Sequence, residues 1–267
     1  MKFFCTVALS ALLATFAMAA PAEEVEARAA GPTLYMAGDS TMATARGASK
    51  IQGWGAYLAY SMKGIKVVNK ALGGRSARSY TVELRFKALI DLVIPGDFVI
   101  ISFGHNDGGR IKDNNGRTDC PGSGNETCTL PDGKTVVQTY VTYLTDAATA
   151  LVDKGATVII SSPTPRNICA AGTCTYTPPR WVEYSKKVVA NTGSKASFID
   201  HGLYVANEYK RLGKAQVDRL YPIDQLHPGP EGSELISKLF VKAVLCTNSV
   251  LAPFVKNATD TVPGACV

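Results

Sequence analysis

The strongest constraint on the fold is a repeated alternation between short apolar runs and longer segments with helical spacing. The runs occupy residues 33–37, 65–69, 97–103, 156–162 and 196–200, and the helical segments occupy 53–63, 81–94, 135–154, 180–191, 202–212 and 230–245. Strands that are apolar throughout and alternate with helices form a parallel sheet covered on both faces. We therefore predict an α/β fold, a three-layer α/β/α sandwich around a five-stranded parallel sheet.

The amino-terminal segment has the features of an export signal. A lysine is followed by an uncharged apolar run that ends in Ala17-Met18-Ala19, the small-x-small pattern that signal peptidase reads. The run is short for a membrane span, and the polar stretch 23–28 separates it from any core. We predict a signal peptide at 1–19, a linker at 20–31, a single domain at 32–267, and a secreted protein without a membrane partner.

All cysteines except Cys5 lie beyond the predicted signal peptide. An even number of cysteines in an exported chain favours disulfides, although sequence alone leaves the pairing open. No pair has the C-x-x-C spacing and no histidine lies beside them, so zinc binding is the weaker alternative. We favour the near neighbours, which are Cys120 with Cys128, Cys169 with Cys174, and Cys246 with Cys266.

Charge and surface motifs limit the classes of partner. The formal net charge is +6, and the sequence contains no long Lys/Arg tract. This argues against nucleic acid as a binding partner. A moderate positive excess suits an acidic glycan, although it equally suits solubility. Asn125 and Asn257 begin N-x-T triplets in expected surface loops, and both are predicted glycosylation sites.

Polar side chains follow several predicted strands, where parallel sheets bind their ligands. Ser40 follows the first strand, and a serine hydroxyl needs a base to become a nucleophile. Of the histidines at 105, 201 and 227, His227 is the best base candidate, because Asp224 precedes it on a proline-bounded loop and can orient its ring. The structural alternative is that Ser40 caps a helix and Asp224 caps a turn.

Donors for an oxyanion follow the next two strands. Gly73-Gly74 can present a backbone N–H without a side chain in the way, and Asn106 carries an amide. Four segments of the chain match, in order, the four blocks of the SGNH (GDSL-type) hydrolases. They are Gly38-Asp39-Ser40-Thr41, the glycine after the second strand (Gly74), Gly104-His105-Asn106-Asp107, and the D-x-x-H of 224–227.

The chain thus resembles the SGNH hydrolases. That resemblance implies a flavodoxin-like sheet order, Ser40 as nucleophile, and His227 as base with Asp224 behind it. It also implies an oxyanion hole formed by the backbone N–H groups of Ser40 and Gly74 and the side chain of Asn106. No G-x-S-x-G occurs, so the nucleophile elbow of the α/β hydrolases is not the template.

Within that superfamily the chain is similar to rhamnogalacturonan acetylesterases. Segments 37–43, 53–55, 74–80, 103–109, 115–120 and 240–246 carry the similarity. It implies a monomeric esterase that removes acetyl groups from galacturonate residues of rhamnogalacturonan I, a pectic polysaccharide, without a metal or organic cofactor. It also implies the first and third cysteine pairs, whereas Cys169 and Cys174 are an addition in a loop after the fourth strand.

An acidic substrate gives the arginines near the sheet ends a possible role. Arg75, Arg78 and Arg110 are candidates for a uronate carboxylate, which a guanidinium binds well. Equally, Arg75 or Arg78 could pair internally with Asp39, Asp107 or Glu83. His201 is a further candidate as a structural or cleft-wall residue, and His105 is expected to orient its loop.

Three rival functions remain at this stage. A metallophosphoesterase would require Asp39, Asn106, Asp107, Asp200, His201 and His227 to converge on metals. A glycan-binding protein would use Ser40 only as a helix cap. An esterase acting on acetylated xylan or on lipids would keep the same catalytic residues and differ only in substrate.

Overall fold

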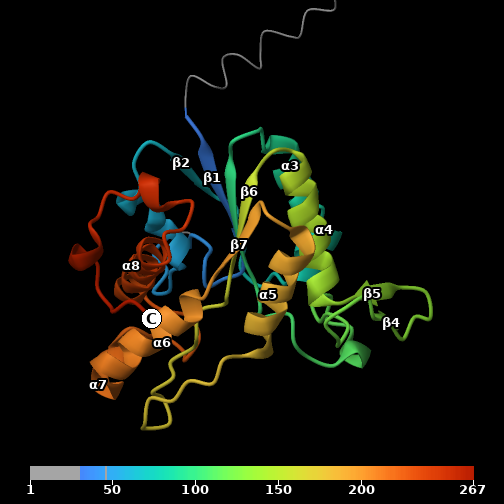
Figure 1. Ribbon diagram of the computed structural model, residues 1–267. Coiled ribbons are helices and arrows are strands. Elements are labelled where there is room, and N and C mark those ends of the chain that lie inside the picture. The colour runs from blue at the N-terminus through green and yellow to red at the C-terminus, as the bar shows by residue number, and fades with distance from the viewer. Residues whose placement is uncertain (1–30, 46) are drawn as a thin grey trace, which may run out of the picture. The chain divides into compact units, whose positions relative to one another are not determined.

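Five parallel strands form the central sheet, as predicted (Figure 1). They are β1 (Thr33–Gly38), β2 (Lys66–Asn69), β3 (Phe98–Ser102), β6 (Thr157–Ser161) and β7 (Ala196–Ile199), in the order β2-β1-β3-β6-β7. The computed structural model describes residues 31–45 and 47–267. The predicted signal peptide at 1–19 and nearly all of the linker at 20–31 lie outside the described residues, and Pro32–Val267 form one compact unit.

Both faces of the sheet are covered because alternate residues of each strand point to opposite sides. Ile100 of β3 joins one buried cluster, whereas Val99 and Ile101 join the other. Helices α6 (His201–Leu212), α7 (Lys214–Arg219) and α8 (Pro230–Cys246) lie on one face, and α2 (Ala77–Val82), α3 (Arg85–Leu92), α4 (Tyr140–Asp153) and α5 (Arg180–Thr192) lie on the other (Figure 1). The predicted three-layer sandwich is confirmed.

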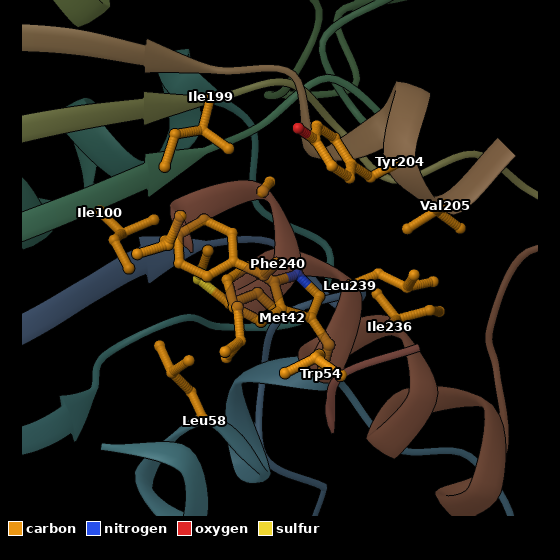
Figure 2. Close-up of a cluster of buried hydrophobic side chains, with 14 of the residues drawn as sticks. Met42, Trp54, Leu58, Ile100, Ile199, Tyr204, Val205, Ile236, Leu239 and Phe240 are labelled. Atoms are coloured by element: carbon orange, nitrogen blue, oxygen red, sulfur yellow. The ribbon is translucent and has the colours of Figure 1, made fainter. Parts of the chain in front are cut away.

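The first cluster contains the aromatic centre of the fold. Figure 2 shows Trp54 and Phe240 packed among aliphatic side chains, including Met42 from the turn after β1. The rings of Trp54 and Phe240 are stacked with their centroids 5.0 Å apart. Burying large rings of this kind stabilises the folded state by several kcal/mol, on the order of 3–5 for each. The turn that carries Ser40 is therefore anchored on a rigid core.

The α-helix predicted over residues 53–63 is not formed. Residues 53–63 form two short 3-10 helices, η1 (Trp54–Ala56) and η2 (Leu58–Ser61). The reason is a close backbone contact with the turn after β1. The N–H groups of Gly53 and Trp54 donate to the carbonyls of Ala43 and Thr41, both at 2.9 Å, and a Cβ on Gly53 would lie 2.2 Å from the Ala43 oxygen.

The predicted helix over 81–94 is divided into α2 and α3. Helix α2 begins earlier because Ser76 and Ser79 form a capping box, in which each side chain accepts a hydrogen bond from the other residue's backbone N–H. Leu84 then adopts a left-handed conformation with φ +57°, which ends the first helix and caps the second. Nothing in the apolar spacing of this segment predicts the break.

The loop predicted over 107–133 contains regular structure. It holds η3 (Ile111–Asp113) and β4 (Thr127–Thr129), and β4 pairs antiparallel with β5 (Val136–Gln138). The predicted helix over 135–154 therefore begins at Tyr140, after Thr139 accepts a hydrogen bond from the Thr142 N–H at 3.1 Å. The β-branched residues Thr135, Val136 and Val137 favour the strand that precedes Thr139. Helix α7 was not predicted.

All three favoured cysteine pairs form disulfides in the structure, Cys120–Cys128, Cys169–Cys174 and Cys246–Cys266. The sequon residues Asn125 and Asn257 are both exposed, and their glycosylation stays a prediction. Within the described residues, no helix has the length and apolar character needed to cross a membrane.

Replacing Leu84 with glycine is expected to raise the free energy of unfolding by about 0.5–1 kcal/mol. The leucine side chain is 64% exposed, so little packing is lost, and a left-handed conformation is disfavoured for any residue with a Cβ. Urea denaturation measures the change. Leu92→Gly, in the right-handed last turn of α3, is the matched control and is expected to lose about 1 kcal/mol. Equal losses in both variants would contradict the explanation of the break.

Candidate active site

Ser40 lies in a tight turn at the carboxyl end of β1. The carbonyl of Asp39 accepts hydrogen bonds from the N–H groups of Met42 and Ala43 at 3.2 and 3.0 Å. The buried Asp39 carboxylate accepts from both the N–H and the hydroxyl of Thr41, at 2.9 and 2.8 Å, so Asp39 makes the capping contacts. The Ser40 hydroxyl is left for another partner, which argues against the capping alternative.

That partner is His227, which is 187 residues away in sequence. Ser40 Oγ lies 2.9 Å from His227 Nε2, and His227 Nδ1 lies 2.8 Å from Asp224 Oδ2. Because a carboxylate can only accept, Nδ1 carries the proton, and Nε2 is the acceptor for the serine hydroxyl. The structure thus brings the three predicted triad residues together as one hydrogen-bonded chain.

Asp224 is held as an anion. Its partial burial raises the pKa of the carboxyl, but hydrogen bonds from the His227 ring and from the backbone N–H groups of His227 and Leu226 outweigh burial and lower the pKa to about 2. Both backbone bonds reach Oδ1 at 2.7 Å. One oxygen therefore fixes the loop and the other orients the imidazole, and a carboxylate in this position stabilises an imidazolium.

The glycine pair that was predicted to supply an oxyanion donor lies beside Ser40, and Asn106 contacts the residue that follows this pair. A Cβ on Gly73 would lie 3.7 Å from the Ser40 Cβ, and Gly74 has φ +77°, in the left-handed region that favours glycine. The Asn106 side chain donates from Nδ2 to the Arg75 carbonyl at 3.0 Å. An amide nitrogen has two hydrogens, so one further donor remains on Asn106.

A pocket of about 200 Å³ opens at Ser40 and His227. Apart from Ile51, its other lining residues are small or polar: Ala43, Thr44, Ala45, Ser49, Gln52, Gly53 and Gly73. The volume is below the range of about 300–1,000 Å³ that is usual for sites of drug-sized ligands. The pocket fits a small acyl group.

His201 and Arg78, two of the candidate substrate-binding residues, are buried in the scaffold, so each has the structural role that was the alternative and neither is placed to bind substrate. His201 is fully buried, donates from Nε2 to the Ile236 carbonyl at 2.8 Å, and packs edge-on against Trp54 and Phe240. Burial lowers the pKa of His201 to about 4, so the ring is neutral. Arg78 is also buried and donates to the Thr118 carbonyl at 2.9 Å. Both side chains hold the scaffold together.

The other two arginines have internal partners. Arg75 forms the internal pair that was the alternative to substrate binding, with its Nε 3.0 Å from the Glu83 carboxylate. Arg110 pairs with Asp113 at 3.0 Å in the loop after β3. His105 donates from Nε2 to the Thr164 carbonyl at 2.9 Å, which orients its loop as expected. The predicted contact of Arg75 and Arg110 with substrate has no support from these positions.

The metallophosphoesterase hypothesis loses one of its ligands because His201 lies in the core. In the part of the chain that the structure describes, no three His, Cys, Asp or Glu side chains are grouped so that they could hold a metal ion. The side chains of Asp39, Asp107 and Asp200 instead accept hydrogen bonds from Thr41, Ala77 and Ser162.

A second hollow, of about 330 Å³, was not predicted from the sequence. It lies after β3 and β6 and is lined by Gly104, His105, Pro163, Thr164, Pro165, Arg166, Asn167, Ile168, Thr175, Tyr176, Thr177, Pro179 and Trp181. The Trp181 ring packs on Gly104, where a Cβ would lie 3.0 Å from it. The Asn167 N–H donates to the Gln225 carbonyl at 2.8 Å, so this wall is joined to the loop of Asp224 and His227. No periodicity marks these residues, because loops that are far apart in the sequence meet here.

A serine, an imidazole and a carboxylate joined by hydrogen bonds at the carboxyl edge of this parallel sheet define an ester hydrolase of the SGNH type. Residues 36–235 match the GDSL-like Lipase/Acylhydrolase family, and the chain belongs to that family.

Its relatives include esterases. A rhamnogalacturonan acetylesterase of Emericella nidulans is 46% identical over 221 residues, which are 82% of this chain and 87% of that protein. A probable rhamnogalacturonan acetylesterase of Bacillus subtilis, YesY, is 38% identical over 80 residues, 30% of this chain and 37% of that protein. Among solved structures, protein YXIM of Bacillus subtilis has a TM-score of 0.64 at 24% identity; the match covers 83% of this chain and 58% of that chain, and it shows the fold alone.

Proposed function

We propose that this chain is a secreted, monomeric esterase that removes acetyl groups from the galacturonate residues of rhamnogalacturonan through an acetyl-enzyme. The chain of hydrogen bonds from Ser40 through His227 to Asp224 carries the proposed chemistry. The proposed substrate is supported by the rhamnogalacturonan acetylesterase that is 46% identical over 82% of this chain.

The residues act in two half-reactions. Ser40 Oγ attacks the acetyl carbonyl carbon while its proton passes to His227 Nε2, and Asp224 stabilises the imidazolium. The backbone N–H groups of Ser40 and Gly74 and the remaining N–H of Asn106 take the oxyanion. His227 then protonates the departing sugar oxygen as the ester C–O bond breaks, which leaves acetyl-Ser40.

Water completes the cycle. His227 accepts a proton from the water as its oxygen attacks the acetyl carbon, and the same three donors take the second oxyanion. The tetrahedral intermediate collapses to acetic acid as His227 returns the proton to Ser40 Oγ, and the released acid ionises to acetate in water. Both half-reactions therefore use one base, and Asp224 stays ionised throughout because of its low pKa.

The small pocket beside Ser40 supports an acetyl substrate. With about 200 Å³ and walls that include small residues such as Ala43 and Gly73, it has room for an acetyl group. Export is supported separately, because the predicted signal peptide precedes three disulfides, which form and persist in oxidising compartments. An esterase acting on acetylated xylan has the same chemistry and is the main competing proposal.

The test is acetate release from acetylated rhamnogalacturonan, acetylated xylan and an aryl acetate, with Ser40→Ala as the background for each substrate. We expect the largest kcat/KM on rhamnogalacturonan. Release chiefly from xylan or from the aryl ester would keep the esterase chemistry and overturn the substrate. No release from any of the three would overturn the proposed function.

A further inference from the structure

Arg117 places a guanidinium beside the proposed oxyanion hole. Its Nη1 donates to the Asn106 Oδ1 at 3.3 Å, and it would lie 3.9 Å from a Cβ built on Gly74. Gly74 and Asn106 are two of the three proposed oxyanion donors. Arg117 therefore stands next to the position that the acetyl carbonyl would occupy, although it was not among the arginines selected from the sequence.

The loop that carries Arg117 is fixed by hydrogen bonds on both sides. Asn115 Oδ1 accepts from the N–H groups of Arg117 and Thr118 at 2.8 and 2.9 Å. Two residues later, the Asp119 N–H donates to the carbonyl of Asp107, the neighbour of Asn106. The Cα position of Arg117 is thus set relative to the oxyanion loop before substrate arrives, and preorganisation of this kind lowers the entropic cost of binding.

The charge of Arg117 is not neutralised within the described residues. None of the ion pairs formed among residues 31–45 and 47–267 includes it, in contrast to Arg75 and Arg110. The side chain is exposed, and the contact with Asn106 uses only one of the five N–H donors that a guanidinium has. The other donors can form the two parallel hydrogen bonds that carboxylates favour.

We propose that Arg117 is a specificity-determining residue that binds the carboxylate of the acetylated uronate. The inference rests on the proposed function and deepens it. In one uronate, the carboxylate and the acetyl ester are separated only by the width of a single sugar ring. Asn106 takes the acetyl oxygen while the guanidinium in contact with it takes the carboxylate, so the enzyme selects esters carried by acidic sugars.

Arg117→Gln tests this assignment because it removes the charge and the fork and keeps a polar side chain. Steady-state kinetics are measured on acetylated rhamnogalacturonan and on the same polymer after its carboxyl groups are reduced to neutral hydroxymethyl groups. Selectivity is kcat/KM on the acidic polymer divided by kcat/KM on the reduced, neutral polymer. A charge-assisted pair contributes enough for Arg117→Gln to lower this ratio by about 10- to 100-fold, mainly through KM on the acidic polymer.

Lys112→Gln is the matched control, because it removes an exposed cation from the same loop and we expect the selectivity ratio to stay within about twofold of wild type. Thermal unfolding of both variants checks that the fold is kept. An unchanged ratio in Arg117→Gln, whether or not the rates fall on both polymers, overturns the inference and leaves the proposed function standing. Absence of acetate release from rhamnogalacturonan by the wild-type protein overturns both.

Discussion

Ser40→Ala and His227→Ala are each expected to lower kcat for acetate release by about 10⁵–10⁶-fold. Among the residues that the structure describes, the serine hydroxyl is the hydrogen-bond partner of His227 Nε2, at 2.9 Å, and neither residue can act without the other. A nucleophile and its base work as a unit, so removing the second member after the first costs little more. We therefore expect the double variant to retain about the same residual rate as either single variant.

The measurement is initial-rate acetate release from an aryl acetate at saturating concentration. Ser123→Ala is a suitable control, because it removes a serine hydroxyl from a surface contact with Lys187. If Ser40→Ala keeps more than about a tenth of the wild-type rate, or if the losses in the double variant multiply, Ser40 and His227 are not the nucleophile and base.

Asp119→Asn is expected to flatten the dependence of stability on pH. Asp107 and Asp119 are buried beside each other under the oxyanion loops, and Asp107 Oδ1 accepts from the Ala77 N–H at 2.7 Å. Burial is the main cause that raises the pKa of both carboxyls. The charge of Asp39 contributes to the rise at Asp107, whose pKa is about 7, and the charge of Asp107 contributes to the rise at Asp119, where Arg78 opposes it. Among the described residues, the other three oxygens of the pair form no hydrogen bond, and we expect the two carboxyls to share a proton.

The direction in which the free energy of unfolding changes with pH follows from proton linkage. The unfolded carboxyls lose their protons near pH 4, whereas the folded pair keeps at least one proton up to about pH 7. The folded state therefore binds more protons between these values, and the free energy of unfolding falls as pH rises through this window. Below about pH 4 both states are protonated and the dependence disappears.

Urea denaturation at several pH values between about 4 and 7 measures the effect. Between about pH 4 and pH 7, the free energy of unfolding of Asp119→Asn is expected to fall by about 1–3 kcal/mol less than that of wild type. The reason is that one of the two carboxyls no longer has to ionise. Asp91→Asn, at an exposed carboxyl paired with Lys87, is expected to follow the wild-type slope. Parallel slopes for wild type and Asp119→Asn would show that the buried pair does not share a proton.

The sheet and the order of the site residues could be predicted because their signals are local. Apolar runs such as 97–103 and 156–162 are buried on both faces, and they fit only the inner strands of a covered sheet. The rule that ligands bind at the carboxyl ends of such strands then selected Ser40 and Asn106. Asp224 and His227 are three residues apart, so their contact was also visible in the sequence.

Only the tertiary structure decided which partner distant in sequence each polar side chain contacts. His201 comes directly after Asp200 and His227 comes three residues after Asp224. His201 is nevertheless buried against Trp54 and Phe240, whereas His227 hydrogen-bonds to Ser40, 187 residues away in sequence. The same holds for the arginines, since Arg78 is buried while Arg117 remains exposed beside Asn106. Side-chain type and spacing specify which strand or helix a residue belongs to. Burial and the choice of partner depend on loops that are distant in sequence and meet only when the sheet has formed.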